Sequence, residues 1–530
     1  MVLETSIICI ALVLAILALV MVSQKLKVAY PMVLVVGGLI LSLIPGLPKV
    51  RVNPELIFII FLPPLLFEAA WQTSWKDLWK WRRVISSFAF LIVLLTSFVI
   101  AIVSSSVIPG FTLALGFLLG GIVSPPDAVS ATAILKYVKV PKRVKCIVEG
   151  ESLLNDASSL IVFRFALVAV ASGQFVFHQA ALSFVLVIAM GIVVGVAIAF
   201  IYYAIHKWLP TDANIDIILT LTAPYVMYIV AERLHFSGVL AVVSGGLLLS
   251  SKSHQFLSTT SRLAISNVWS ALGFIFNGVV FMLIGLELPE IIRQLGDVSL
   301  IGAIGYGVLI SAVLIVLRIL CTLGASVFTV FISRFITTAD NRPGWKGPII
   351  LGWAGMRGVV SLASALSVPF YLSNGTAFPQ RNLILFITFT VILITLVVQG
   401  LTLPLLINWV NMEDPDDLLP PHELNILIRK TLAKTSLAYL NEEYAEQLKS
   451  NKPLQQLRFM YENEQYFSMD DDGRSKDFQR IYGLLIEKQR ECLDQINNMP
   501  RIDSELVRRY HGLLDLEEEK VRVRYSDEDN

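Results

Sequence analysis

Long apolar runs recur along the first 410 residues of this chain and decide what it can fold into. A membrane-spanning helix needs about 20 mostly apolar residues, and many stretches approach or exceed that length. We predict about thirteen such helices, over residues 6–23, 28–44, 55–70, 84–107, 111–135, 146–172, 179–205, 215–233, 237–251, 265–287, 300–333, 348–370 and 382–410. The expected fold class is an all-α polytopic membrane protein.

Charge divides the sequence into two parts. Residues 1–410 contain 15 acidic and 25 basic residues, whereas residues 411–530 contain 26 acidic and 17 basic residues. We therefore predict a transmembrane domain over 1–410 and an acidic domain over 411–530. Apolar periodicity in the second part predicts soluble amphipathic helices over 424–448, 478–496 and 502–521.

Basic residues in the predicted loops set the orientation. With the N-terminus outside, 17 of them fall in loops on the cytoplasmic side and five in external connections. Because cytoplasmic loops carry the excess of Lys and Arg, we expect an external N-terminus, a cytoplasmic tail and a location in the plasma membrane.

Two of the predicted helices are interrupted. The fifth contains Pro125 and Pro126 ahead of Asp127, and the twelfth contains three glycines around Arg357. Broken helices survive at membrane depth only where they face protein or a wet cavity. Breaks in matching positions of two halves indicate inverted repeats with a transport site near the midplane. We predict two inverted six-helix repeats.

Ionisable residues inside the predicted helices mark candidate functional positions, because charges are costly in a bilayer. Ser152 and Asp156 are four residues apart and share one helix face. They would offer hydroxyl and carboxylate oxygens to a transported metal ion such as Na⁺. Asp127 lies at a helix break, and Glu68 follows a proline-rich segment; the structural alternatives are that Asp127 caps a helix and that Glu68 reaches only interfacial water.

Glu151 and Asn155 share a neighbouring face of the same helix. A buried Glu151 without a partner would be costly, so we expect an ion pair between Glu151 and Arg357. A structural alternative for Asn155 is a buried hydrogen bond with Asp156.

Competition for one carboxylate is sufficient for exchange. Burial disfavours the charged form of a carboxylate, and a nearby cation favours it. A buried Asp156 can therefore hold a proton or a metal ion, and whichever binds excludes the other.

Five motifs, taken together and in order, resemble the monovalent cation:proton antiporters of the NhaP/NHE type, most closely the bacterial Na⁺/H⁺ branch. The resemblance covers roughly residues 5–410. The motifs are FLPPLLF at 61–67, SPPDAV at 124–129, GESLLND at 150–156, FNGVVFMLIGLELP at 276–289 and GMRGVVS at 355–361.

The resemblance implies thirteen helices with crossed, unwound helices five and twelve, in a homodimer that works by an elevator-like cycle. Asp156 matches the ion-binding aspartate, Ser152 a cation-contacting serine, and Asp127 the acidic residue at the crossing. Asn155 matches the asparagine associated with electroneutral exchange.

The remaining matches are less direct. Glu151 and Arg357 match a pair that orients the asparagine, and Glu68 falls near an acidic residue that joins the cation site in some members. Some members have Thr or Val where Pro126 precedes Asp127, which leaves the Pro126 carbonyl as a candidate ligand.

Several alternatives stay open. K⁺/H⁺ exchange fits the same oxygen ligands, and a passive cation channel is a more distant possibility. The sequence lacks HExxH, GxSxG and phosphate-loop motifs, so we expect no enzyme. We also expect no cofactor and no nucleic-acid partner. The expected physiological role is sodium and pH homeostasis. The tail is either a regulatory domain with an unknown ligand or a passive anchor.

Overall fold

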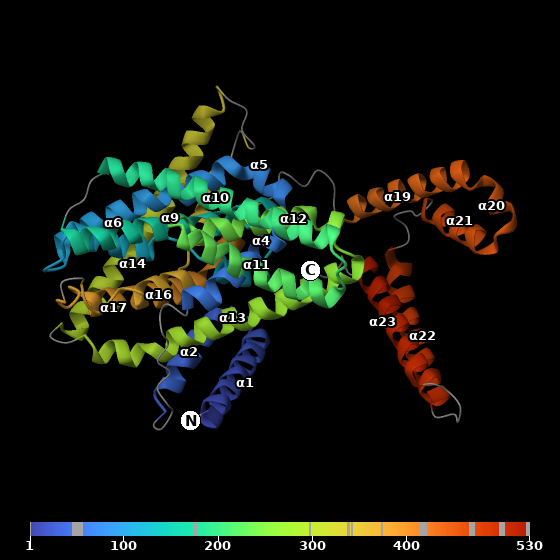
Figure 1. The fold of residues 1–530 in the computed structure, drawn as a ribbon, viewed down its shortest axis with the longest axis horizontal. Coiled ribbons are helices and arrows are strands. Elements are labelled where there is room, and N and C mark those ends of the chain that lie inside the picture. The colour runs from blue at the N-terminus through green and yellow to red at the C-terminus, as the bar shows by residue number, and fades with distance from the viewer. Residues whose placement is uncertain are drawn as a thin grey trace. The chain divides into compact units, whose positions relative to one another are not determined.

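The computed structural model describes residues 2–44, 57–173, 177–295, 298–335, 340, 343–372, 375–412, 421–465, 472–497 and 504–525. Within these ranges the chain is helical and contains no β-strand, apart from an isolated antiparallel bridge between Tyr371 and Ala377. The chain divides into two compact units, Met1–Asp414 and Pro415–Asn530 (Figure 1).

The first unit holds the apolar helices. Its elements are α1 (Val2–Leu26), α2 (Tyr30–Ser42), η1 (Ile57–Phe61), α4 (Leu62–Gln72), α5 (Trp75–Ser86), η2 (Ser87–Ile92), α6 (Val93–Val107), α7 (Leu113–Val123), α8 (Ala128–Leu135), α9 (Lys142–Ser172), α10 (Phe177–Trp208), α11 (Ala213–Arg233), α12 (Gly238–Phe256), α13 (Thr259–Arg293), α14 (Leu300–Ile332), α15 (Lys346–Trp353), α16 (Val359–Leu366), α17 (Arg381–Ile394), η3 (Thr395–Gln399) and α18 (Gly400–Val410).

Eight segments of the described chain are long and apolar enough to cross a membrane. They are α5–η2–α6, α7–α8, α9, α10, α11, α13, α14 and α17–η3–α18. The other predicted spans coincide with shorter apolar helices (α1, α2 and η1–α4), with α12, and with the interrupted pair α15–α16. The prediction of an all-α polytopic membrane protein is confirmed, while the count of thirteen spans stays a prediction.

Both predicted breaks are present. α7 ends at Val123 and α8 begins at Ala128, because proline removes backbone donors and clashes with the preceding turn. α15 ends at Trp353 and α16 begins at Val359, in the glycine-rich segment around Arg357. Each break leaves backbone groups at two new helix ends without intrahelical partners.

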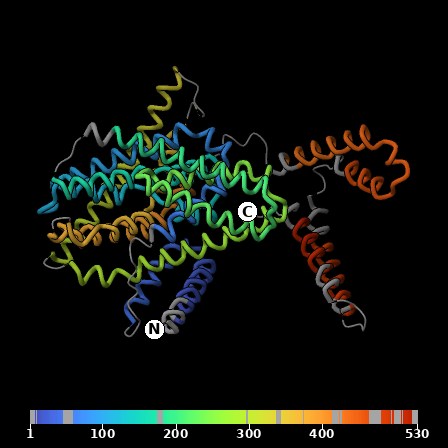
Figure 2. Tube along the Cα trace, in the orientation of Figure 1, coloured from blue at the N-terminus to red at the C-terminus, as the bar shows by residue number. Residues whose placement is uncertain are grey.

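Close helix crossings build the core around these breaks. α9 contacts α6, α7 and α10, and α14 contacts α15 and α17. Figure 1 shows α6, α9 and α10 running in broadly similar directions, and Figure 2 traces α13 along one side of the first unit. α2 packs against α13 through Gly38 and Gly285, where an added Cβ on either residue would meet the other helix's backbone.

The second unit is also helical in its described residues. Its elements are α19 (Pro421–Glu443), α20 (Ala445–Ser450), α21 (Lys452–Gln465), α22 (Asp472–Asn497) and α23 (Ser504–Tyr525). α19 packs against α21, a helix that the sequence analysis did not predict. Arg490 of α22 forms salt bridges with Asp515 and Glu518 of α23, with N–O distances of 2.6 and 2.5 Å.

The glycine crossing generates a prediction for stability. Gly285→Val should lower the free energy of unfolding by about 1–3 kcal/mol, because the new side chain has to displace the backbone of α2. Gly305→Val on α14 is the matched control, since a Cβ there meets no atom within 4 Å. Thermal unfolding in detergent compares the two variants; equal losses would contradict the proposed tight crossing.

Candidate functional site

The two helix breaks touch each other at Asp127. The Asp127 backbone N–H donates a hydrogen bond to the carbonyl of Met356, with an N–O distance of 2.7 Å. Gly358 lies so close to Asp127 that any Cβ there would clash with the carboxylate. The interruption of α7–α8 is therefore joined directly to the interruption of α15–α16.

Asp127 caps the second half of its broken helix. Its carboxylate accepts hydrogen bonds from the backbone N–H of Val129 at 3.1 Å and of Ser130 at 3.3 Å, and from the Ser130 hydroxyl at 2.6 Å. These bonds satisfy orphan donors at the start of α8 and place negative charge at the positive end of its dipole. The capping alternative for Asp127 is confirmed, and a cap is compatible with a role at the cation site.

α9 is tied to this break by two polar side chains. Asn155 Nδ2 donates to the Pro126 carbonyl at 3.1 Å, and Ser152 Oγ accepts the backbone N–H of Ala128 at 3.1 Å. Asn155 Oδ1 is buried and has no hydrogen-bond partner within the described ranges of the chain. The hydrogen bond predicted as an alternative between Asn155 and Asp156 is not formed, because the Asn155 amide instead donates to the Pro126 carbonyl.

Asp156 lies on the same helix, is 7% exposed, and is within electrostatic range of Asp127. Among the residues that the structure describes, none donates a hydrogen bond to its carboxylate. Both carboxylate oxygens of Asp127 accept hydrogen bonds in the helix cap, so the Asp156 carboxylate is the more available of the two to bind an ion. Oxygens of Asp156, Ser152 and Asn155 thus lie within one stretch of α9, beside the crossed breaks.

The predicted ion pair between Glu151 and Arg357 is wrong in its basic partner. Glu151 pairs with Arg318 of α14 through two hydrogen bonds of 2.8 Å, and both residues are buried. Two parallel N–H···O bonds are the strong geometry for an arginine and a carboxylate. Arg318 lies over Gly355, where a Cβ would clash with it, so the glycine-rich break also makes room for the pair.

Arg357 donates hydrogen bonds to backbone carbonyls at the helix breaks. Its Nε donates to the Val123 carbonyl at 2.9 Å, and its terminal nitrogens reach the carbonyls of Ser124 and Gly355. The C-terminal carbonyls of α7 lack intrahelical donors and carry partial negative charge, which attracts a cation. Arg357 therefore satisfies the broken helix, and it stays within electrostatic range of Glu151 and Arg318.

Glu68 stands apart from these contacts. It accepts a hydrogen bond from Gln72 at 2.7 Å on its own helix, α4, and it packs against Gly273 of α13. Tyr30 of α2 lies within electrostatic range of both Glu68 and Asp127. The structure thus brings together Asp127, Ser152, Asn155 and Asp156, and leaves Glu68 outside their direct contacts.

Sequence reasoning missed Arg318 and Tyr30 as neighbours of the site. A signal for Arg318 was present, because a lone arginine inside a long apolar helix requires a partner. No group of three or more His, Cys, Asp or Glu side chains placed to hold a metal occurs in the described residues. A bound cation at this place would need hydroxyl, amide and carbonyl oxygens in addition to carboxylates.

Broken helices that meet over buried polar groups are the arrangement of a membrane transporter. A family model described as "Sodium/hydrogen exchanger, transmembrane" matches residues 11–409. The chain belongs to this family, whose members are transporters and not enzymes, and the resemblance drawn from the five motifs is confirmed.

Known relatives and a solved structure agree with this assignment. The "Sodium, potassium, lithium and rubidium/H(+) antiporter" of Bacillus pumilus is 32% identical over 94% of this chain and 75% of its own length. The protein of the same description from Bacillus subtilis is 33% identical over 87% of this chain and 70% of its own length. The structure of the sodium proton antiporter MjNhaP1 from Methanocaldococcus jannaschii has the same fold, with a TM-score of 0.60 and 18% identity over 78% of this chain and 99% of that chain.

The Glu151–Arg318 pair generates a stability prediction. Arg318→Leu should lower the free energy of unfolding by about 3–5 kcal/mol, because it leaves Glu151 buried and unpaired. The double variant Glu151→Leu/Arg318→Leu should recover much of that loss. Arg164→Leu serves as control, because its pair with Glu232 is partly exposed and worth about 0–1 kcal/mol.

Thermal unfolding in detergent of wild type, Glu151→Leu, Arg318→Leu and the double variant completes a double-mutant cycle. A double variant whose loss equals the sum of the two single losses would show that the two residues are not energetically coupled.

Proposed function

We propose that this protein is a secondary active antiporter that exchanges Na⁺ or Li⁺ for H⁺ across the plasma membrane. The observation that carries the proposal is the Asp156 carboxylate, buried beside Asp127 where two broken helices cross. A carboxylate without a donor in the described residues can accept either a proton or a cation. Occupancy by one ion excludes the other, which couples their movement.

The cation site would use oxygens that the crossing already presents. Asp156 supplies the carboxylate and Ser152 the hydroxyl, while the unpartnered Oδ1 of Asn155 supplies an amide oxygen. Asp127 contributes negative charge while it caps α8. The Pro126 carbonyl already accepts a hydrogen bond from the Asn155 amide, so we expect this carbonyl to be a secondary ligand. Glu68 would act at a distance, on the approach to the site.

Movement of the site would follow the elevator scheme that the sequence resemblance implies. The broken helices and α9 are bound together by Asn155, Ser152, Arg357 and the Glu151–Arg318 pair, which favours their moving as one body. We propose that this body slides against a dimerisation domain in a homodimer with thirteen spans in inverted repeats. The N-terminus would face outside and the acidic, helical tail would lie in the cytoplasm as a regulatory domain.

K⁺ is the second candidate substrate. The two Bacillus relatives are described as antiporters of sodium, potassium, lithium and rubidium, and the carboxylate, hydroxyl and amide oxygens of the proposed site do not by themselves select one of these ions. A passive cation channel remains the more distant alternative, since a competing proton at Asp156 would interrupt free conduction.

Asp156→Ala should abolish cation-driven proton flux, because it removes the carboxylate for which both ions are proposed to compete. The measurement is the loss of a preset pH gradient in proteoliposomes after addition of Na⁺, Li⁺ or K⁺. Wild type should respond to Na⁺ and Li⁺, and its apparent KM for Na⁺ should rise as pH falls because protons compete for the carboxylate.

The folded protein has to survive in the variant, so size-exclusion elution of Asp156→Ala is compared with wild type. Exchange that persists without Asp156 would move the site elsewhere. A wild-type response to K⁺ alone would keep the mechanism and replace the substrate. Flux of Na⁺ without counter-moving protons would support the channel.

Exchange should be electroneutral, because Asn155 leaves Asp156 as the single carboxylate of α9 that binds ions. One charge would then travel in each direction. An imposed membrane potential, set with K⁺ and valinomycin, should leave the Na⁺-driven proton flux unchanged. A rate that follows the imposed potential would falsify this stoichiometry while leaving antiport itself intact.

A further inference from the structure

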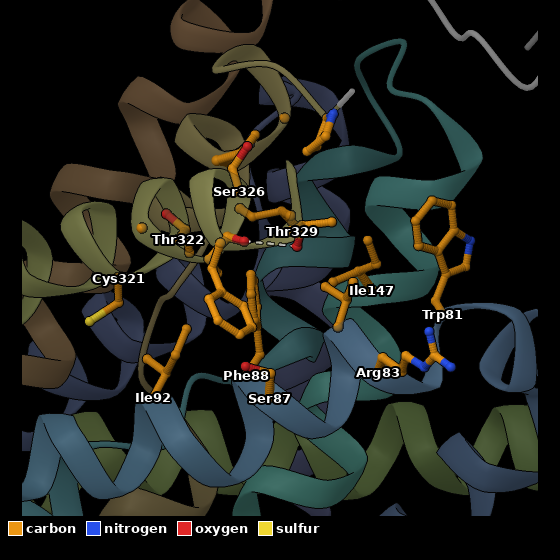
Figure 3. Close-up of a pocket in the computed structure, with 18 of the residues that line it drawn as sticks. Trp81, Arg83, Ser87, Phe88, Ile92, Ile147, Cys321, Thr322, Ser326 and Thr329 are labelled. Atoms are coloured by element: carbon orange, nitrogen blue, oxygen red, sulfur yellow. Dashed lines mark hydrogen bonds between the residues drawn. The ribbon is translucent and has the colours of Figure 1, made fainter. Parts of the chain in front are cut away.

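One concave feature of the first unit lies away from the carboxylates. It is a groove of about 950 Å³ lined by α5–η2–α6, the start of α9, the second half of α14 and part of α15 (Figure 3). None of Asp127, Ser152, Asn155 and Asp156 lines it. The groove therefore needs an explanation apart from the cation site.

The interior of the groove is apolar. Its floor includes the buried side chains of Phe88, Ile92 and Ile147. The hydroxyls of Thr322 and Thr329 in its wall donate to carbonyls of their own helix, those of Ile319 and Ala325. A ligand along this part gains little from polar groups and much from burying hydrocarbon.

The rim of the groove is continuous with the lipid-facing surface. Leu91, Leu320 and Phe328 line it and are 64%, 61% and 61% exposed. Their helices are long and apolar enough to cross a membrane. An opening bordered by exposed apolar side chains at membrane depth faces hydrocarbon, so its natural occupant enters from the bilayer.

One end of the groove is basic. Lys80, Arg82 and Arg83 of α5 and Arg143 of α9 line it, against a single lining carboxylate, Asp340, which pairs with Arg143 at 2.6 Å. In Figure 3, Trp81 and Arg83 lie at one end of the view, and Cys321 and Ile92 at the other. The groove thus has a positively charged end and an apolar remainder.

We propose that this groove binds an anionic phospholipid, with its phosphate at the basic end and an acyl chain along η2 and α14. The charge pattern matches a lipid of that kind along its whole length, and the volume is within the range of about 300–1,000 Å³ seen for ligand sites. The basic end lies on parts of α5 and α9 that the charge distribution predicts to be on the cytoplasmic side, and the cytoplasmic leaflet carries the anionic lipids.

Such a lipid would bridge the two helices that carry the buried ion pair. On α9, Glu151 follows the groove residues Arg143 and Ile147. On α14, Arg318 precedes the groove residues Thr322 and Thr329. A lipid seated between them would hold the same helices together from the bilayer side.

α14 offers a substitution that fills the groove without disturbing the fold. Gly324 lines the groove, and a Cβ there meets no atom within 4 Å. Gly324→Trp should therefore occupy the space of the acyl chain. Gly305→Trp is the matched control, because Gly305 is equally open, belongs to the same helix and does not line the groove.

The charged end is tested separately. Arg82→Gln/Arg83→Gln should weaken phosphatidylglycerol binding by about 20- to 30-fold, since two basic side chains near the headgroup are removed. Lys25→Gln/Lys27→Gln removes the same charge from another predicted cytoplasmic loop and should leave binding unchanged.

The experiment measures retained lipid by native mass spectrometry after full-length protein is exchanged into detergent with equal phosphatidylglycerol and phosphatidylcholine. A phosphatidylglycerol with a photoreactive acyl chain reports the site by cross-linking. We expect wild type and Gly305→Trp to retain phosphatidylglycerol in preference, with cross-links on η2 and α14, and Gly324→Trp to lose it.

Three outcomes would overturn the proposal. These are retention of phosphatidylglycerol by Gly324→Trp at the wild-type level, equal retention of the two lipids by wild type, and displacement of phosphatidylglycerol by inorganic phosphate alone. The readout is lipid binding, so none of these outcomes bears on cation exchange. Arg82 and Arg83 are exposed, so the Arg82→Gln/Arg83→Gln variant keeps the test valid if Gly324→Trp fails to fold.

Discussion

The hydrogen bond from the Asp127 amide to the Met356 carbonyl holds the centre of the molecule together. Two helices are broken at membrane depth, and each break exposes donors and acceptors that the bilayer cannot satisfy. These donors and acceptors are satisfied because the two breaks contact each other. Asp127 satisfies the start of α8, Arg357 satisfies the end of α7, and the backbones bond across the gap. The proposed ion-binding groups are those that this arrangement does not use.

Much of this was readable from the chain. Pro125 and Pro126 cannot continue a helix, so the first break was predictable, and the glycines around Arg357 marked the second. Spacing by four residues placed Ser152 and Asp156 on one face of α9. These inferences are local, because each rests on the backbone preferences of residues next to one another in sequence.

The partner of Glu151 could not be read in that way. Arg318 lies on α14 and Arg357 in the break between α15 and α16, and the partner of Glu151 depended on which of them satisfies the broken helix. Arg357 lies beside the orphan carbonyls of Val123 and Ser124 and is taken up by them, which leaves Arg318 for Glu151. The position of Glu68 could not be read from local patterns either, since its distance from the crossing is set by how α4 packs against α13.

The Asn155 amide has a wider consequence. Its nitrogen is held by the Pro126 carbonyl, so its oxygen has to point the other way. A carboxylate in its place would turn an oxygen toward that carbonyl, and the two acceptors would repel each other. The proline break therefore restricts how many negative charges this part of α9 can carry. In this molecule the shape of a neighbouring backbone therefore favours an amide over a carboxylate at position 155.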